Sequence, residues 1–219
     1  MPHREDVVLL WIFMENIKYY EDGIIDIIKY YISIYTFKSN EELKKAVKLW
    51  DFNKEKCIEQ YGHISYWDTS KITDMSNLFY NYKYFNQDLS FWNTRQVKDM
   101  NRMFSGATNF NQPIGSWDTS NVTDMESMFH IAISFNQPIG SWDTSKVINM
   151  KNMFRRATSF NKDISRWDTC KVKDMRYLFN RANYFNQDIS SWVTSNVIYV
   201  NNNIFYSCRI RKEYKPEFN

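Results

Sequence analysis

The sequence predicts an α/β repeat solenoid, a rod of about six 25-residue coils that each contain a short strand and a short helix. Three observations predict this class: a strict period, an apolar spacing typical of a helix, and a column of β-branched residues. The period is set by six tryptophans that recur without insertion or deletion, namely Trp67, Trp92, Trp117, Trp142, Trp167 and Trp192. We expect the six indoles to form core, because a single short coil cannot bury its own apolar face.

A helix of about two turns is expected in the second half of each coil. One helix face is indicated by the i, i+3, i+4 and i+7 spacing of Met125, Met128, Phe129 and Ala132. The residue before this face is aspartate or asparagine in five copies: Asp74, Asp99, Asp124, Asn149 and Asp174. Both residue types satisfy an unpaired amide at a helix N-terminus, so we interpret this column of equivalent positions as helix caps rather than as catalytic acids.

Short strands are expected elsewhere in each coil, around Ile114 and Val122 in the third copy. They would pair with the coils above and below. Two polar columns agree with such stacking. Asparagines equivalent to Asn111 are expected to satisfy backbone groups inside a bend, and threonines equivalent to Thr119 are expected to bond the turn after tryptophan.

Four segments follow from this pattern. Residues 63–205 hold the six copies, and residues 36–62 are expected to form a helical N-terminal cap that starts with a capping box at Ser39. Residues 1–35 are an apolar N-terminal extension that either packs on the first coil or docks a partner or a membrane surface. Residues 206–219 are expected to be a basic C-terminal tail.

The repeat unit resembles that of the BspA-like leucine-rich repeat family, in its DUF285 branch. The shared signature is W-D-T-S-x-V-x-D-M-x-x-M-F preceded by F-N-Q, and its six in-phase copies cover about residues 60–205. The resemblance implies a leucine-rich-repeat-like rod, used in surface, adhesive or interaction proteins of mycoplasmas, gut bacteria, some protists and large DNA viruses. It implies no catalytic residues. The chain departs from the secreted members of the family because no export signal is recognisable in it.

Composition favours a non-enzymatic protein in a reducing environment. The three cysteines share no spacing and leave an odd thiol, and the apolar run at 7–14 is too short to span a bilayer. We therefore expect an intracellular or virion location, with no transmembrane segment and no cleavable signal peptide. The histidines are scattered, and no phosphate-binding loop, paired-cysteine spacing or nucleophile elbow is found. These features predict no enzymatic activity, no metal and no cofactor.

Function is expected in the columns that vary between copies, because the recurrent columns build the scaffold. Coils four and five are rich in cations that stacking would align into a basic stripe: Lys146, Lys151, Arg155, Arg156, Lys171, Arg176 and Arg181. The leading hypothesis is a scaffold for protein–protein interaction that binds its partner through this stripe. Two alternatives stay open: a structural component of a giant-virus particle or similar large assembly, and weak polyanion binding. The net charge of only +3 predicts that any nucleic-acid binding is non-specific.

Overall fold

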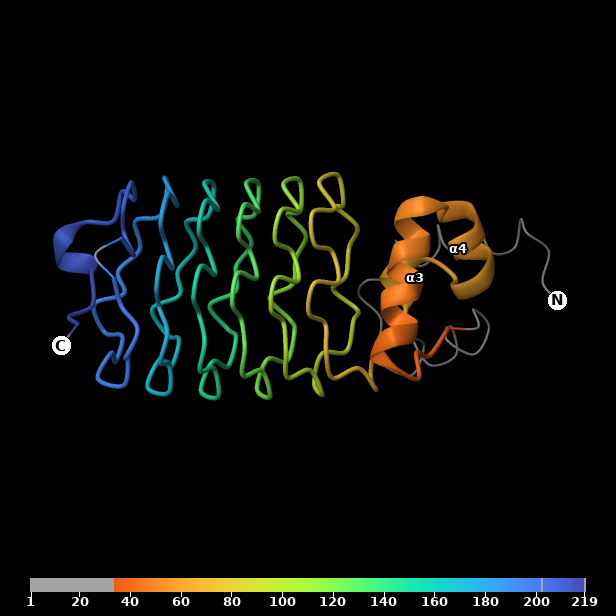
Figure 1. The fold of residues 1–219 in the computed structure, drawn as a ribbon, viewed down its shortest axis with the longest axis horizontal. Helices are drawn as coiled ribbons and strands as arrows, with labels where there is room; N and C mark the ends of the chain where they lie inside the picture. Colours follow the sequence, from red (N-terminus) through yellow and green to blue (C-terminus); the bar gives the residue numbers. More distant parts are fainter. Residues whose placement is uncertain (1–33, 202, 219) are drawn as a thin grey trace, which may run out of the picture. The chain divides into compact units, whose positions relative to one another are not determined.

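The computed structural model of the chain describes residues 34–201 and 203–218. The chain divides into two compact units, Met1–Tyr35 and Thr36–Asn219. The second unit contains a helical segment followed by six coils, which we number from the coil that begins at Trp67 to the coil that begins at Trp192 (Figure 1). The prediction for the N-terminal extension falls on residues that lie almost entirely outside the described part of the chain.

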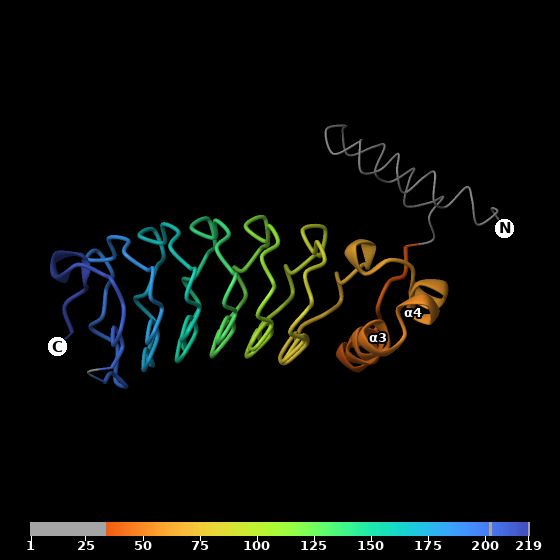
Figure 2. The same ribbon diagram turned by 90° about the horizontal axis from the view of Figure 1, so that it is seen from above.

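In the described part of the chain, two α-helices precede the coils: α3, Asn40–Phe52, and α4, Lys54–Tyr61 (Figure 2). Ser39 is the N-cap of α3, and its hydroxyl oxygen accepts a hydrogen bond from the amide of Glu42 at 3.1 Å. The carboxylate of Glu42 accepts from the amide of Lys38 at 2.8 Å, one residue before the amide that a capping box uses. The predicted start of the helix at Ser39 is therefore confirmed.

The first coil is closed by α3, which supplies bonds that a preceding coil would otherwise make. The side-chain oxygen of Asn40 accepts from the amides of Thr73 and Asp74 at 3.0 and 3.2 Å. Lys44 Nζ lies 2.6 Å from Asp74 Oδ2. The buried face of the helix carries Leu43, Ala46, Val47 and Trp50. Covering the end of the stack in this way shields the core and the backbone groups of coil one.

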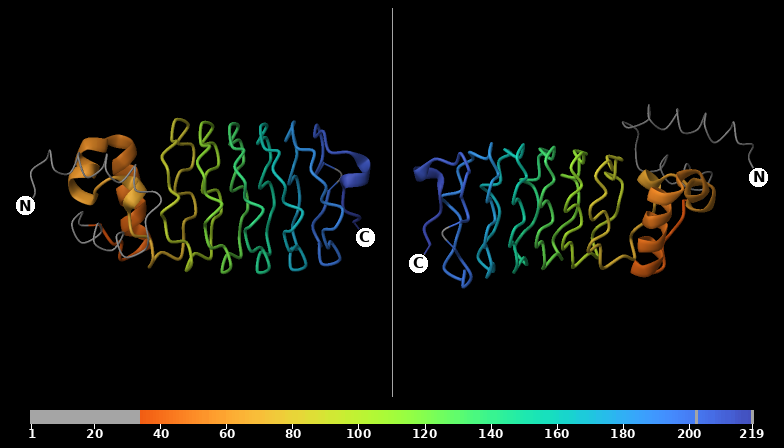
Figure 3. Two further views of the ribbon diagram at one scale, coloured as in Figure 1. Left: turned by 180° about the vertical axis from the view of Figure 1, so that it is seen from behind. Right: turned by 45° about the horizontal axis from the view of Figure 1, so that its top comes forward.

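The predicted α/β architecture is wrong. Within the described residues, the coils contain neither an α-helix nor a regular strand. Among residues 34–201 and 203–218, the helices other than α3 and α4 are single 3-10 turns, η1 at Ile64–Tyr66 just before the first coil and η2 at Lys212–Tyr214 in the sixth. Each coil is instead a series of turns that lies beside the next coil, as the two views in Figure 3 show.

The segment expected to be helical is a run of four-residue turns. In coil three the first turn is closed by a hydrogen bond of 3.2 Å from the amide of Met128 to the carbonyl of Met125. Its third residue, Ser127, has φ of 57°, and Ile131 repeats this left-handed conformation with φ of 60°. A type II turn requires positive φ at its third position, whereas an α-helix has negative φ throughout. Successive turns bring apolar residues back to the same side, so they produce the same spacing as a helix.

Turns replace the helix because alternate amides of this segment bond to the next coil. Ser127 N donates to Lys151 O at 2.8 Å. Phe129 N donates to Met153 O at 2.9 Å. An α-helix would use these amides in bonds to carbonyls four residues back in the same segment. The carbonyls of the next coil would then lose their donors, and buried backbone groups without partners are costly.

The predicted strands are reduced to isolated bridges of one residue. In coil three the parallel bridge lies at Asp124, two residues after Val122. The backbone at Val122 closes a turn, since its amide lies 2.9 Å from the carbonyl of Thr119. The carbonyl of Ile114 likewise accepts from Trp117 N at 3.3 Å. Ile114 and Val122 are fully buried, so their columns indicate core positions rather than strands.

The core consists of aromatic columns that run through the coils. The six tryptophans are at most 5% exposed, and Trp117 Nε1 donates to Leu89 O, 28 residues earlier in the chain, at 3.0 Å. Two phenylalanine columns stack beside them. The ring centroids of Phe104 and Phe129 in neighbouring coils are 5.8 Å apart, and those of Phe104 and Phe110 are 3.9 Å apart. The indoles thus belong to the core and do not form a row of ligand-stacking platforms.

Threonine and asparagine side chains join the coils through hydrogen bonds. Thr119 Oγ1 donates to the carbonyl of Asp143 at 2.9 Å, in the turn after the next tryptophan. The side-chain oxygen of Asn111 accepts from the amide of Asn136 at 2.9 Å. The asparagine column therefore satisfies backbone amides, with each bond running from the main chain of one coil to the side chain of its neighbour.

Residues 203–218 complete the sixth coil rather than forming a separate tail. The carbonyl of Ile204 accepts from the amide of Phe179, one coil earlier, at 3.1 Å. Ile204 and Ile210 are 3% and 6% exposed. Phe205 stacks on Phe179 with ring centroids 6.0 Å apart and continues the first phenylalanine column. This segment therefore extends the core to the C-terminal end of the stack.

Candidate interaction surface

The column predicted to cap helices opens the run of turns in coils one to five. No helix follows these residues, so the capping prediction is wrong. Each side chain nevertheless accepts a hydrogen bond from the amide two residues later, at 2.7 Å for Asp124 and 3.1 Å for Asn149. Asp and Asn suit such Asx turns for the reason that suits them to helix starts, an oxygen within reach of a nearby amide. The column comprises Asp74, Asp99, Asp124, Asn149 and Asp174.

The negative charge of this column is compensated more fully at Asp74, in coil one, than at Asp99, in coil two. Burial acts to raise the pKa of Asp74, but hydrogen bonds from Lys44 and Ser76 outweigh it and the pKa is lowered. Burial raises the pKa of Asp99, and the carboxylates of Asp124 and Asp74 add to the increase. The aspartate column is therefore negative mainly on coils two and three, at Asp99 and Asp124.

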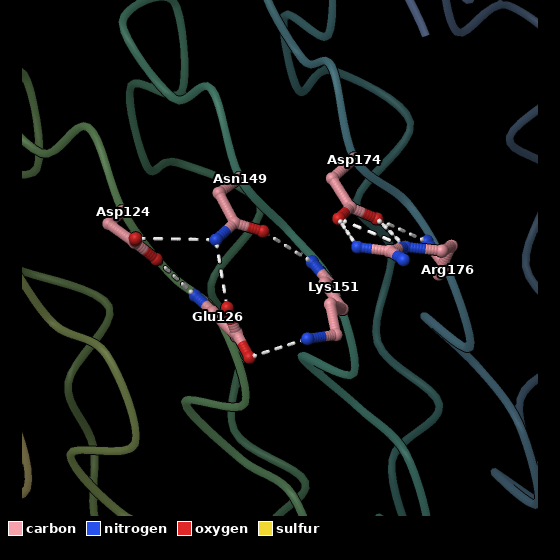
Figure 4. Close-up of polar contacts among 6 residues, drawn as sticks. All are labelled: Asp124, Glu126, Asn149, Lys151, Asp174 and Arg176. Carbon is pink, nitrogen blue, oxygen red and sulfur yellow. Dashed lines mark hydrogen bonds and ion pairs between the residues drawn. The ribbon is translucent and has the colours of Figure 1, made fainter. Parts of the chain in front are cut away.

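Two cations of the predicted stripe are paired beside this column (Figure 4). Lys151 Nζ lies 3.1 Å from Glu126 Oε1, and Glu126 also accepts from Asn149 Nδ2 at 3.1 Å. Arg176 binds both carboxylate oxygens of Asp174, with Nη2 at 2.6 Å and Nε at 3.0 Å. This part of the surface alternates in sign and is not a continuous basic stripe.

The other cations of the stripe occupy different columns. Lys146 and Lys171 are exposed a few residues after the tryptophan, and Lys146 Nζ donates to Asn121 Oδ1 at 2.7 Å. Arg156 and Arg181 are exposed in the second half of coils four and five. The structure therefore divides the predicted stripe among several columns of each coil.

Arginines of coils four to six lie over tyrosine rings of neighbouring coils. The distance from guanidinium carbon to ring centroid is 5.2 Å for Arg155 and Tyr177, 5.9 Å for Arg181 and Tyr206, and 4.8 Å for Arg209 and Tyr184. Within the described residues, none of these arginines forms a salt bridge. We call these residues, with the exposed Arg156, the arginine–tyrosine ladder: Arg155, Arg156, Arg181, Arg209, Tyr177, Tyr184 and Tyr206.

Sequence reasoning missed the tyrosines of this ladder, although the period carried a signal for two of the three. Tyr206 follows Arg181 by 25 residues, and Arg209 follows Tyr184 by the same interval. Residues one repeat apart are neighbours in a stack, so an arginine and a tyrosine at this separation are placed side by side. Variable columns need to be compared across copies for complementary pairs as well as for like charges.

His130 lies beside Arg155, close to the ladder. Its Nδ1 is 3.5 Å from Ser105 Oγ. Burial, together with the positive charges of Arg155, Arg156 and Arg102, lowers the pKa of His130 to about 4. The imidazole is therefore neutral near pH 7, and its surroundings disfavour a catalytic role that requires it to become cationic.

Metal-ligating side chains do not gather anywhere in residues 34–201 and 203–218: no group of three or more histidine, cysteine, aspartate or glutamate residues could hold an ion. No helix in this part of the chain has both the length and the apolar character needed to cross a membrane. Cys57, Cys170 and Cys208 are unpaired.

Comparison with known protein families gives two matches that together span most of the chain. The profile of a family described as "Mycoplasma protein of unknown function, DUF285" matches residues 51–147 and again residues 114–215. The two ranges overlap, as expected when one profile is fitted to a repeated unit. No curated protein and no solved structure matches the chain.

Proposed function

The chain belongs to the DUF285 family, and from this premise we propose that it is a non-enzymatic scaffold for protein–protein interaction. One observation carries the proposal, the different use of recurrent and variable side chains. Recurrent side chains bond neighbouring coils, and the variable columns of coils four to six expose cations and tyrosines.

The recurrent polar side chains are occupied within the stack. Thr119 and Trp117 donate to carbonyls of other coils at 2.9 and 3.0 Å, and Asn111 accepts from an adjacent coil at 2.9 Å. Equivalent bonds recur along the stack. These columns therefore have little hydrogen-bonding capacity left for a partner.

The variable columns have the composition of a protein interface. Arg156 and Arg181 are exposed, and Tyr184 and Tyr206 are each 55% exposed. Arginine and tyrosine are enriched among the residues that dominate binding energy, since each combines a large contact area with directional polar groups. Mounting them on a hydrogen-bonded stack lowers the entropy cost of ordering the surface on binding.

Affinity purification with charge reversals tests the proposal. Arg156→Glu/Arg181→Glu alters two exposed cations of the ladder, and Lys71→Glu/Arg95→Glu makes the same change of net charge on coils one and two. We expect a co-purifying protein to be lost with the first variant and retained with the second. Identical sets of co-purifying proteins for the wild type and both variants would refute the proposal, provided that circular dichroism shows all three proteins folded.

Two other roles make different predictions. A structural component of a giant-virus particle or similar assembly would occur at fixed stoichiometry in purified particles. A polyanion binder would lose affinity steeply as salt rises. The pairing of Lys151 with Glu126 and of Arg176 with Asp174 favours a protein partner, because carboxylates beside the cations repel a continuous polyanion.

We further propose that the scaffold works in an intracellular compartment or in a virion, which the three unpaired cysteines support. Fractionation of the source cells and of purified particles tests this location. Recovery of the protein only from an oxidising extracellular fraction would contradict it.

A further inference from the structure

We propose that the arginine–tyrosine ladder binds an acidic segment of a partner protein through its unpaired guanidinium groups. This inference rests on the proposed scaffold function and adds the surface and the chemistry of the partner. It follows from the local charge, the placement of the guanidinium groups and the spacing of the coils.

The ladder lies in the most positive stretch of the coils. Each coil has an eleven-residue stretch that starts at its first methionine position and ends at its second phenylalanine position. In coils one to three these stretches, 75–85, 100–110 and 125–135, together contain two cations and one glutamate. The equivalent stretches of coils four to six contain six cations and no acidic residue: 150–160, 175–185 and 200–210. Glu126 and Asp174, from outside these stretches, pair with two of the six. Four arginines are left without a neutralising partner in the described part of the chain.

Stacking on tyrosine prepares the guanidinium groups of Arg155, Arg181 and Arg209 for a carboxylate. A ring beneath the guanidinium plane covers one face and leaves the N–H edge open for a bidentate contact. The pair of Arg209 and Tyr184 borders a surface hollow that could receive a short acidic side chain, lined by Thr158, Asn183, Tyr184, Ser207, Cys208 and Arg209.

The coil spacing suits an extended peptide that runs along the stack. The ring centroids of Phe154 and Phe179 are 5.5 Å apart, and those of Phe160 and Phe185 are 5.9 Å apart. Alternate side chains of an extended peptide lie on one face at intervals of roughly 6.5 Å. A segment with an acidic residue at alternate positions therefore brings successive carboxylates near the arginines of successive coils.

The surroundings of the ladder favour a protein segment over a nucleic acid. The ladder spans three coils, and the aspartate column carries Asp99 and Asp124 on the coils before it, where a longer phosphate backbone would be repelled. Single-stranded nucleic acid also gains affinity by stacking bases on open aromatic faces. One face of each ladder tyrosine is already covered by an arginine.

Fluorescence anisotropy with defined probes tests the inference on the full chain. The probes are a labelled peptide of alternating glutamate and serine, its glutamine–serine counterpart, and an oligothymidylate of similar length. We expect the glutamate peptide to bind most tightly at low ionic strength and the glutamine peptide to bind at least roughly tenfold more weakly. Tighter binding of the oligothymidylate than of the glutamate peptide would overturn the inference in favour of a nucleic-acid surface.

Variants then locate the binding surface. Arg156→Glu/Arg181→Glu should weaken binding of the glutamate peptide by roughly tenfold or more, and Arg156→Gln/Arg181→Gln should weaken it less, because neutralisation adds no repulsion. Lys71→Glu/Arg95→Glu is the control of equal net charge and should have little effect. An equal loss in the control variant would show that binding follows overall charge and would overturn the inference.

The tyrosines are tested by a matched pair of substitutions. Tyr184→Phe keeps the ring under Arg209 and should retain binding, whereas Tyr184→Ser removes the ring and should weaken binding by several-fold. Equal binding by the two variants would refute the role of the ring. Thermal melts of each variant establish that the stack is intact.

The outcomes separate this inference from the proposed function. If the glutamate peptide does not bind, but a cellular partner is still lost with Arg156→Glu/Arg181→Glu, the acidic-segment inference fails and the scaffold function stands. If neither the peptide nor any cellular partner depends on these arginines, both proposals fail.

Discussion

Glycine at position 102 should make the protein more stable than alanine at the same position, and the sign of this difference tests the turn architecture. Arg102 is exposed, has φ of 53° and donates its amide to Glu126 O of the next coil at 2.8 Å. In coil two, Arg102 occupies the left-handed turn position that corresponds to Ser127 in coil three. Arg102→Ala and Arg102→Gly remove the same exposed side chain and differ only in the freedom of the backbone.

The expected magnitude follows from two opposing terms. A residue with a Cβ pays about 1–2 kcal/mol in the left-handed region, and glycine does not. Glycine loses more conformational entropy on folding, which costs about 0.5–1 kcal/mol relative to alanine. The net difference at position 102 is therefore about 0.5–1 kcal/mol in favour of glycine. In a helix the order would reverse, with alanine favoured by about 0.8–1 kcal/mol.

Urea unfolding followed by far-UV circular dichroism measures this difference as a change in midpoint at constant slope. Lys48 provides the internal control, because it is exposed within α3, where Lys48→Ala should be more stable than Lys48→Gly. The two pairs of variants should thus give differences of opposite sign. If alanine is the more stable residue at position 102 as well, the turn conformation assigned to the coils is refuted.

Three further predictions concern the core, the asparagine column and pH. Trp117→Ala should cost about 3–5 kcal/mol of unfolding free energy, because it empties a core position and removes one of the two donors to Leu89 O; a cost below that of a surface substitution in urea unfolding would contradict it. Asn136→Ala should cost about 1 kcal/mol by leaving the amide of Asn161 unpaired, whereas Asn136→Asp keeps an acceptor oxygen and should cost less; equal thermal melts would contradict this. The pKa of His130 is about 4 in the folded protein and about 6.5 when unfolded, so the unfolded chain binds more protons as pH falls below about 6.5. Stability should decrease by about 1–2 kcal/mol between about pH 6.5 and 4, after allowance for partial exposure, and His130→Asn should flatten this part of the stability–pH profile; an unchanged slope would contradict the assignment.

The columns of the repeat were readable from the sequence because identical environments recur in every coil. Trp117 and Phe129 are buried as their periodicity indicated, and Asn111 bonds a neighbouring coil. Repetition strengthens such inferences, because a residue type unsuited to its environment would be unfavourable in all six coils. The same argument identified variable columns as the place to look for function.

The candidate surface was only partly predictable. Like charges at equivalent positions suggested a basic stripe, but Lys151 and Arg176 are paired with Glu126 and Asp174. Glu126 lies one full repeat before Lys151, so a comparison of copies could have paired them. Asp174 lies in another column, two residues before Arg176, and this contact depends on the path of the backbone. Arg181 and Tyr206, separated by one full repeat, are the kind of pair that sequence comparison alone can find.

The sequence by itself determined the 25-residue register, the identity of the core columns and the start of the cap at Ser39. Only the tertiary structure decided that Ser127 and Ile131 adopt left-handed turns in place of a helix. The physical reason is that helices and successive turns bury the same i, i+3 and i+4 side chains and differ in the direction of their amides. That direction is set by hydrogen bonds to the carbonyls of the next coil. The positions of those carbonyls cannot be read from the local pattern of residues.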